Sequence, residues 1–229
     1  MPASSESQRE PLSRSVEDYL KAIHRLSADG RPASTTQIAD ALAVAPPSVT
    51  GMVKRLSEQG LLSHEPYRGV TLTDLGLREA RRVIRRHRLI ETYLVGFLGY
   101  TWDSVHDEAE RLEHAVSERL VDLIDQMLGR PAVDPHGDPI PTAQGTMARP
   151  KYLNLLTAPL HEPLVVSRVI DQDPAFLRFA EQQGLVPGHP VAVVSRDPAS
   201  DAVAITGEGR PAVTLGARAA SKILVNVRK

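Results

Sequence analysis

Four side chains that commonly bind metal ions recur within the segment HDEAERLEH, residues 106–114. On a helix, side chains three and four positions apart lie on one face. That spacing brings together His106, Glu110, Glu113 and His114. Carboxylates crowded among imidazoles favour a divalent cation between them. The spacing therefore predicts a metal site with oxygen and nitrogen donors.

A second pair of the same residue types, His87 and Glu91, lies four residues apart upstream. Three arginines flank this pair, at positions 85, 86 and 88. Taken alone, the pair favours a solvated helix face on which Glu91 is the partner of an arginine. The other histidines are scattered along the chain, and we interpret each as structural or solvent-exposed.

The chain has 229 residues and no cysteine. Its length suffices for a sizeable core and about two domains. The lack of cysteine excludes disulfides, a thiolate nucleophile and cysteine-type zinc sites. The sequence has no run of ~18 apolar residues that would span a membrane, and its polar N-terminus lacks the apolar core of a signal peptide. We expect a cytoplasmic protein with no membrane partner.

Charge is unevenly distributed along the chain, although the net charge is only -1. Residues 44–90 hold nine Lys or Arg against four acids, whereas residues 91–140 hold three against eleven. A basic segment beside an acidic one indicates a polyanion as partner of the first and a cation as partner of the second.

The N-terminal third reads as helix, helix, turn, helix and hairpin. Apolar residues recur at helical spacing in SVEDYLKAIHRLSA, STTQIADALAV and PPSVTGMVKRLSEQG, and LLSHEPYRGVTLTD alternates around a turn. This order is typical of a winged helix-turn-helix, which binds DNA. A small helical domain that binds nothing is the alternative.

Six residues of this region are candidates to contact double-stranded DNA. Ser48 and Thr50 can reach bases or phosphates, while Lys54 and Arg55 suit phosphates. The remaining two are Pro47, at the start of the same predicted helix, and Arg68, at the tip of the hairpin.

The rest of the chain predicts a helical segment, a linker and a small β-barrel. Residues 74–98 form a basic amphipathic helix whose last third is almost entirely apolar, and the segment ERLVDLIDQML adds another apolar helix face. These two apolar helix faces within one short segment indicate a homodimer interface. Burial within one subunit is the alternative. Beyond a Pro- and Gly-rich stretch, short β-type runs alternate with turns.

Enzymatic interpretations fit the motifs poorly. There is no HExxH motif, and Arg111 stands three residues before His114, where a di-iron carboxylate bundle needs a glutamate. Neither GxxxxGK[ST] nor GxGxxG is present. A metalloenzyme would also leave the basic winged helix without a role, so we expect no catalysis.

With a predicted winged helix followed by HRLIE, VHDEAERLEH and DPHGDPIP, the chain resembles the diphtheria toxin repressor family of metal-dependent transcriptional repressors. The resemblance covers residues 15 to about 142. It implies an α+β chain with four parts: a winged helix-turn-helix (1–74), a helical dimerisation and metal-binding domain (75–141), a linker (142–161) and an SH3-like, FeoA-like β-barrel (162–229).

The resemblance also implies two metal sites per subunit. One would consist of His87, Glu91 and His106, with Asp173 as the best match for a further ligand from the third domain. The position three residues later, where a ligand is also expected, is Phe176, which cannot bind a metal. The other site, which activates the protein, would consist of Asp18, Glu110, Glu113 and His114.

Two positions of the activating site bear on which metal it binds. Iron-responsive members of the family have methionine where Asp18 stands and cysteine where Glu110 stands. Hard oxygen donors favour Mn²⁺ over softer metals, so the resemblance is to the manganese-responsive branch. The chain departs from small two-domain manganese members at Lys21, where those have a second acid. Regulation by Fe²⁺ is the alternative.

The resemblance implies a mechanism in which the metal fixes the DNA-binding domain relative to the dimerisation domain. Two winged helices of a dimer would then suit successive major grooves of a palindromic operator, ~34 Å apart. We therefore expect a manganese-activated repressor of metal-uptake genes. A repressor whose metal is purely structural is a further alternative.

Overall fold

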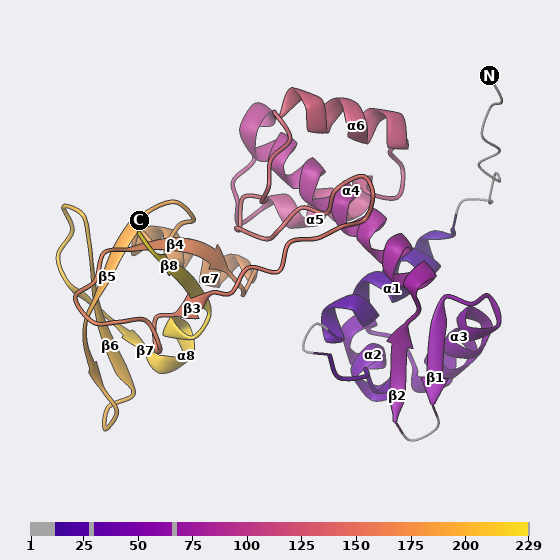
Figure 1. The fold of residues 1–229 in the computed structure, drawn as a ribbon, viewed down its shortest axis with the longest axis horizontal. Coiled ribbons are helices and arrows are strands. Elements are labelled where there is room, and N and C mark those ends of the chain that lie inside the picture. The colour runs from indigo at the N-terminus through magenta and orange to yellow at the C-terminus, as the bar shows by residue number, and fades with distance from the viewer. Residues whose placement is uncertain (1–11, 28–29, 66–67, 229) are drawn as a thin grey trace. The chain divides into compact units, whose positions relative to one another are not determined.

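The computed structural model describes residues 12–27, 30–65 and 68–228 (Figure 1). The chain forms two compact units, Met1–Ile84 and Arg85–Lys229. The boundary between them falls inside one long helix, α4 (Asp74–Leu98).

The first unit is a helix-turn-helix followed by a β-hairpin, as the sequence predicts. Its elements before α4 are α1 (Arg14–Leu26), α2 (Thr35–Leu42), α3 (Pro46–Glu58), β1 (Leu62–Glu65) and β2 (Gly69–Leu72). The two strands are antiparallel, with Leu62 opposite Leu72. Ala33, just before α2, adds two backbone hydrogen bonds to Val70 of the hairpin. The predicted winged helix-turn-helix is therefore confirmed.

Local signals set the two helices and the turn between them. The Ser34 hydroxyl accepts a hydrogen bond from the Gln37 N–H at 3.1 Å, and the Gln37 side-chain oxygen accepts one from the Ser34 N–H at 2.9 Å. This capping box starts α2. The chain then turns at Ala43, whose φ of 51° is left-handed. Pro46 and Pro47 follow in the first turn of α3, where proline needs no N–H partner.

One face of each helix packs into a common core in the first unit. The core includes Leu20 of α1, Ile38 of α2, Val49 and Leu56 of α3, and Val70 of β2, each fully buried. In α3, Val49, Val53 and Leu56 are buried and Met52 and Ser57 are half-buried, whereas its other residues are exposed. The fold thus presents one side of α3 outward.

The second unit contains the remainder of α4, two short helices and a β-sheet domain. Its elements are α5 (Val105–Leu112), α6 (Glu118–Met127), β3 (Leu153–Asn154), β4 (Leu164–Val169), α7 (Pro174–Gln182), β5 (Pro190–Asp197), β6 (Ala202–Gly207), β7 (Val213–Gly216), α8 (Ala217–Ala220) and β8 (Ile223–Val227). The strands form one antiparallel sheet in the order β3-β8-β4-β5-β6-β7. The expected small SH3-like β-domain is present at the C-terminus.

A single hydrophobic core fills the sheet domain. It draws fully buried side chains from β4, β5, β6, β7 and β8 and from α7. One member comes from outside the domain: Trp102, in the segment between α4 and α5, is 6% exposed and belongs to this core. The helical part and the sheet domain are therefore packed together within the second unit.

Two segments differ from the sequence-based expectation. The segment 106–114 is not one continuous helix, because α5 ends at Leu112, Glu113 is its C-cap and His114 lies beyond it. The chain must turn there, since Ser117 already caps α6 by accepting a hydrogen bond from the Leu120 N–H. Residues 153–161, predicted as linker, carry β3 and bury Leu155 and Ala158 in the core of the sheet domain.

Candidate metal centre

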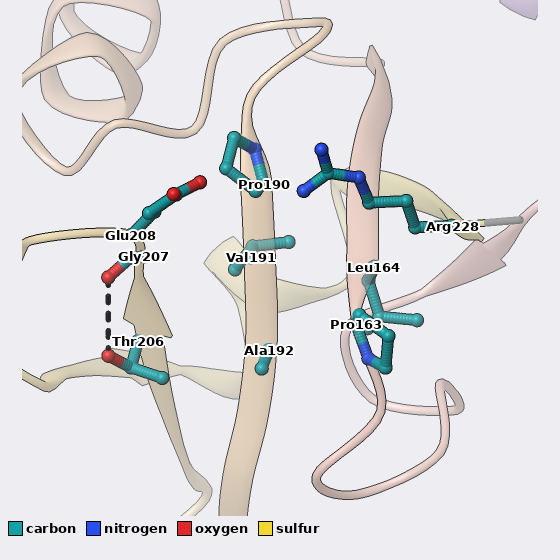
Figure 2. Close-up of a pocket in the computed structure, with 9 residues that line it drawn as sticks. All are labelled: Pro163, Leu164, Pro190, Val191, Ala192, Thr206, Gly207, Glu208 and Arg228. Atoms are coloured by element: carbon teal, nitrogen blue, oxygen red, sulfur yellow. Dashed lines mark hydrogen bonds between the residues drawn. The ribbon is translucent and has the colours of Figure 1, made fainter.

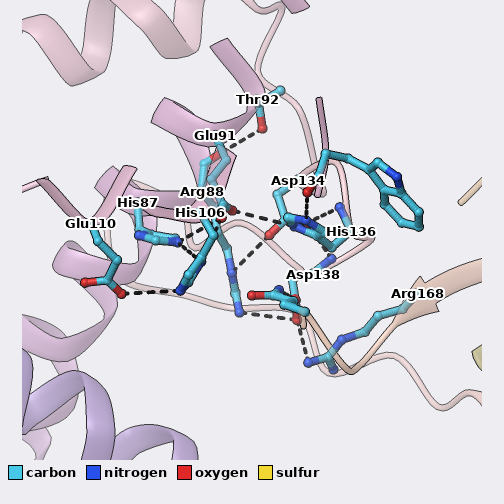
Figure 3. Close-up of polar contacts among 12 residues, drawn as sticks. His87, Arg88, Glu91, Thr92, His106, Glu110, Asp134, His136, Asp138 and Arg168 are labelled. Carbon is cyan, nitrogen blue, oxygen red and sulfur yellow. Dashed lines mark hydrogen bonds and ion pairs between the residues drawn. The ribbon is translucent and has the colours of Figure 1, made fainter. Parts of the chain in front are cut away.

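Three side chains predicted as one metal site converge in the second unit (Figure 3). The Nε2 atom of His87 lies 2.9 Å from Glu91 Oε1 and 3.1 Å from His106 Nδ1. The same His106 atom lies 3.2 Å from Glu91 Oε1. His87 and Glu91 are one turn apart on α4, and both are buried. Two ring nitrogens and one carboxylate oxygen thus face one another, an arrangement suited to a transition-metal ion.

The second predicted site is also assembled from neighbouring side chains. Glu110, Glu113 and His114 each offer a ligand atom within 4.8 Å of the others. Glu113 is fully buried, and its Oε1 lies 3.2 Å from His114 Nε2. Asp18, the fourth predicted ligand, lies on α1 in the first unit, and its part in this site stays a prediction.

Glu113 also touches the other site. Its Oε2 lies 2.5 Å from His87 Nδ1, while its Oε1 faces His114. On the same side, His106 Nε2 lies 3.6 Å from Glu110 Oε1. The two groups of side chains are therefore in contact through Glu113 and through the His106–Glu110 pair.

A third cluster, Glu91, Asp134 and His136, was not predicted as a site from the sequence. All three residues are buried, at 1%, 4% and 0% exposure. Each has a buried polar atom without a hydrogen bond: Glu91 Oε2, Asp134 Oδ2 and His136 Nδ1. Their ligand atoms lie within 4.8 Å of one another. Arg88 Nε lies 3.5 Å from Asp134 Oδ2. Because buried polar groups are usually hydrogen-bonded in proteins, the three atoms that face one another form a candidate metal site.

The orientation of His136 suits a metal ligand. The Trp102 carbonyl oxygen accepts a hydrogen bond from His136 Nε2 at 2.7 Å, so Nε2 carries a proton. In a neutral imidazole Nδ1 is then an acceptor. Yet Nδ1 faces Glu91 Oε2 at 3.8 Å and Asp134 Oδ1 at 4.0 Å, which are also acceptors. A cation resolves this arrangement, and metal-binding histidines commonly donate their other N–H to a carbonyl.

The pKa values of two carboxyl groups point the same way. Burial acts to raise the pKa of Glu91, but hydrogen bonds with His106 and His87 outweigh it and hold that pKa well below its usual range. Burial, followed by the nearby Asp138 and Glu91, raises the pKa of Asp134 well above its usual range. Arg88, 3.5 Å from Asp134 Oδ2, acts in the opposite direction and lowers this pKa. Carboxylates are thus crowded at Asp134, and a metal ion that bound there would displace a proton.

The signal for this third cluster was present in the segment DPHGDPIP, which carries an aspartate and a histidine two residues apart. These residues form no regular helix or strand face, so periodicity could not place them. The Asp134 carboxylate oxygen Oδ1 accepts hydrogen bonds from the N–H groups of His136 and Asp138, at 2.8 and 2.9 Å. This tight turn brings both side chains beside Glu91.

Asp173, the further ligand expected from the third domain, lies at the start of α7. It caps α7, where its Oδ1 accepts hydrogen bonds from the N–H groups of Ala175 and Phe176 at 3.0 and 3.1 Å. It is exposed, and no cluster of metal-binding side chains found among the described residues includes it. Its role as a ligand stays a prediction.

The residues expected to contact DNA lie on exposed surfaces of the first unit. The exposed side of α3 carries Pro47, Ser48, Thr50, Lys54 and Arg55. On the hairpin, the side chain of Arg68 is 80% exposed and pairs with Glu65 at 3.1 Å. All six positions are accessible to a partner, and their contacts with DNA stay predictions.

A shallow pocket of about 230 Å³ lies on the sheet domain (Figure 2). Its walls are mostly proline, valine, leucine and alanine side chains, with one acid, Glu208, and one base, Arg228. The residues that line it include no nucleophile beside a general base and none of the three clusters described above.

Comparison with known proteins covers nearly the whole chain. Residues 11–70 match the family model for the N-terminal DNA binding domain of iron dependent repressors. Residues 73–142 match their metal binding and dimerisation domain, and residues 153–227 match a FeoA domain.

Within the part of the chain that the structure describes, none of the helices could span a lipid bilayer.

Individual relatives respond to different metals. The chain is 31% identical over 212 residues to the iron-dependent repressor IdeR of Mycobacterium leprae, covering 87% of this chain and 91% of that protein. It is 37% identical over 123 residues to the regulator MntR of Lysinibacillus sphaericus, covering 52% of this chain and 88% of that protein. A solved manganese-dependent transcriptional repressor in complex with manganese is 39% identical with a TM-score of 0.83, over 93% of this chain and 100% of that one. The protein is therefore a metal-dependent transcriptional repressor of the diphtheria toxin repressor family, the group that includes IdeR and MntR.

Proposed function

We propose that this repressor is activated by Mn²⁺, binds palindromic operator DNA as a homodimer in the cytoplasm, and controls genes for metal uptake. The observation that carries the choice of metal is the donor set of the predicted activating site. Glu110, Glu113 and His114 supply only oxygen and nitrogen atoms, and Asp18 would add another oxygen. Hard oxygen donors suit Mn²⁺ better than thiolate or thioether sites do.

The residues of the activating site belong to different units, which gives the metal its proposed role. Glu110, Glu113 and His114 lie in the second unit, and Asp18 lies on α1 of the DNA-binding unit. Held in one coordination sphere, they would fix α1 relative to the dimerisation part. A metal that binds this arrangement of ligands more tightly than it binds any other conformation of the protein shifts the population of molecules toward it.

Further coordination is proposed at the neighbouring clusters. His87, Glu91 and His106 would hold a second ion through Glu91 Oε1. Glu91 Oε2 faces Asp134 and His136, so that these two residues extend the site on the other side of the same carboxylate. Glu91 would thus serve both clusters, because its two oxygens are independent acceptors.

An apolar surface on the second unit supports the proposed homodimer. Five large apolar side chains of α4 and α6 are between 45% and 56% exposed: Phe97, Leu98, Leu120, Leu123 and Met127. Such exposure is unusual in a monomeric protein and marks an interaction surface. The matched metal binding and dimerisation domain includes all five residues, which makes a second copy the proposed partner.

Operator binding in the presence and absence of Mn²⁺ tests the proposed function. A duplex selected from random DNA by the Mn²⁺-loaded protein would be titrated by fluorescence anisotropy, with Mn²⁺ or with chelator. We expect a tight, Mn²⁺-dependent complex of two subunits per palindrome. Equal affinity in both conditions would overturn the proposal.

Exchange of two ligands tests the choice of metal. Asp18→Met combined with Glu110→Cys replaces two hard oxygens with soft sulfur donors. We expect the metal that activates operator binding to change from Mn²⁺ toward Fe²⁺. The measurement is operator affinity against each metal under anaerobic conditions. Loss of folding, seen by circular dichroism, would instead support a structural metal.

A further inference from the structure

One buried carboxylate, Asp138, has partners on two different elements of the second unit (Figure 3). It is 3% exposed. Its Oδ1 lies 3.3 Å from Arg88 Nη2 of α4 and forms a very short ion pair with Arg168 of β4. Its Oδ2 accepts a hydrogen bond from Gln172 Nε2 at 2.9 Å. Asp138 thus joins the helical part to the sheet domain.

The turn that contains Asp138 is packed against β4 without spare room. The Val169 N–H donates to the His136 carbonyl oxygen at 2.9 Å. Gly137 has φ +85°, and a Cβ at this position would lie 2.0 Å from the Ser167 carbonyl oxygen. Only glycine permits this approach. Movement of β4 therefore requires movement of the turn that carries His136.

His136 is held on its other side by a residue seated in the sheet domain. The Trp102 carbonyl oxygen accepts the hydrogen bond from His136 Nε2, and the two rings stack with centroids 5.9 Å apart. The Trp102 side chain belongs to the core of the sheet domain. Both contacts of His136, through its backbone and through its ring, thus depend on how that domain is docked.

We propose that Asp138 is a positioning residue: by joining Arg88 to Arg168 it fixes the turn that carries Asp134 and His136, and so couples docking of the sheet domain to metal affinity at the Glu91–Asp134–His136 cluster. The inference rests on the proposed function only in treating that cluster as a metal site. Asp138 itself needs no contact with the ion. Outer residues that orient ligands typically contribute 10–100-fold to metal affinity.

Two variants separate positioning from simple electrostatics. Asp138→Asn removes a negative charge, which by charge alone weakens cation binding. Arg168→Gln removes a positive charge, which by charge alone strengthens it. If the ion pair acts by positioning the turn, both variants weaken Mn²⁺ binding. The matched control is Arg218→Gln, which removes the same positive charge from an exposed side chain on α8 of the same domain.

The chain supplies its own probe of docking, since Trp102 is its only tryptophan. Emission of the full-length dimer would be recorded without metal, and Mn²⁺ binding would be measured by the loss of the free-ion paramagnetic resonance signal. We expect Asp138→Asn and Arg168→Gln each to shift the Trp102 emission to longer wavelength. Each should also weaken Mn²⁺ binding at one class of sites at least about tenfold. Arg218→Gln should change neither.

If Arg168→Gln bound Mn²⁺ more tightly than the wild type, the inference would be wrong, and the removed positive charge alone would explain the effect. A red shift with unchanged Mn²⁺ binding would overturn it too, because Asp138 would then hold the domain without affecting the ligands. If the wild-type protein bound no Mn²⁺ at all, the proposed function would fail, a result distinct from both.

Discussion

Replacing Glu113 with glutamine is expected to abolish Mn²⁺-dependent operator binding. Glu113 is fully buried, and its carboxylate contacts His87 at 2.5 Å and His114 at 3.2 Å. Glutamine keeps the shape but removes the negative charge and one acceptor. Mutation of a residue that only hydrogen-bonds to a metal ligand typically lowers metal affinity about 10–100-fold. We therefore expect loss of a ligand itself to lower Mn²⁺ affinity at least about 100-fold. Anisotropy titration of operator DNA against Mn²⁺ measures the effect.

The matched control for Glu113 is Glu108→Gln. Glu108 lies on α5, five residues before Glu113, and its side chain pairs with the exposed Arg111 at 3.3 Å. Exposed pairs of this kind contribute ~0–1 kcal/mol, so the control should bind Mn²⁺ and operator as the wild type does. A Glu113→Gln protein that still responds to Mn²⁺ at wild-type concentrations would remove Glu113 from the site.

Replacing Leu123 with lysine is expected to convert the protein to monomers that bind operator DNA weakly. Leu123 lies on the outer side of α6, 52% exposed, whereas Val121 and Ile124 of the same helix are buried within the subunit. The folded subunit should therefore tolerate the change. In a dimer the unpaired ammonium would be buried, which costs several kcal/mol, so we expect at least a ~100-fold weaker dimer. Sedimentation equilibrium measures it.

Gln182→Lys is the control for Leu123. It adds the same charge to the same unit at an exposed polar position on α7 of the sheet domain, away from the apolar surface of α4 and α6. We expect this variant to remain dimeric and to bind the operator. A dimeric Leu123→Lys protein would show that the apolar surface of α6 is covered by something other than a second copy.

The fold was largely predictable because its signals are local. The capping box at Ser34 and the prolines that start α3 appear in the sequence and set these helices in the structure. Residues one turn apart on a helix, such as His87 and Glu91, could likewise be assigned to one face from their spacing alone. Both lie together in the structure, but the solvated face predicted from the pair alone is wrong, because both are buried and Glu91 pairs with His87 and His106.

The remainder of the site depends on contacts that no local pattern encodes. Asp134 and His136 meet Glu91 across more than forty residues of sequence, through a turn whose shape depends on Gly137 and β4. A period of 3.6 or 2 cannot describe such a turn. Glu113 and His114 lie beyond the last residue of α5, because the chain turns there before Ser117 caps α6. Asp173 was matched by position alone, and the structure gives its carboxylate a capping role.

The position of Glu113 between two clusters bears on how steeply the repressor responds to rising metal. Its two oxygens face His87 and His114, on opposite sides of one side chain. If both clusters bind metal, the two ions share this one buried carboxylate, so that binding at either cluster changes the charge that the other ion meets. By linkage each ion would then change the affinity of the other by the same factor. Positive coupling would narrow the range of ion concentration over which operator binding changes, and negative coupling would widen it.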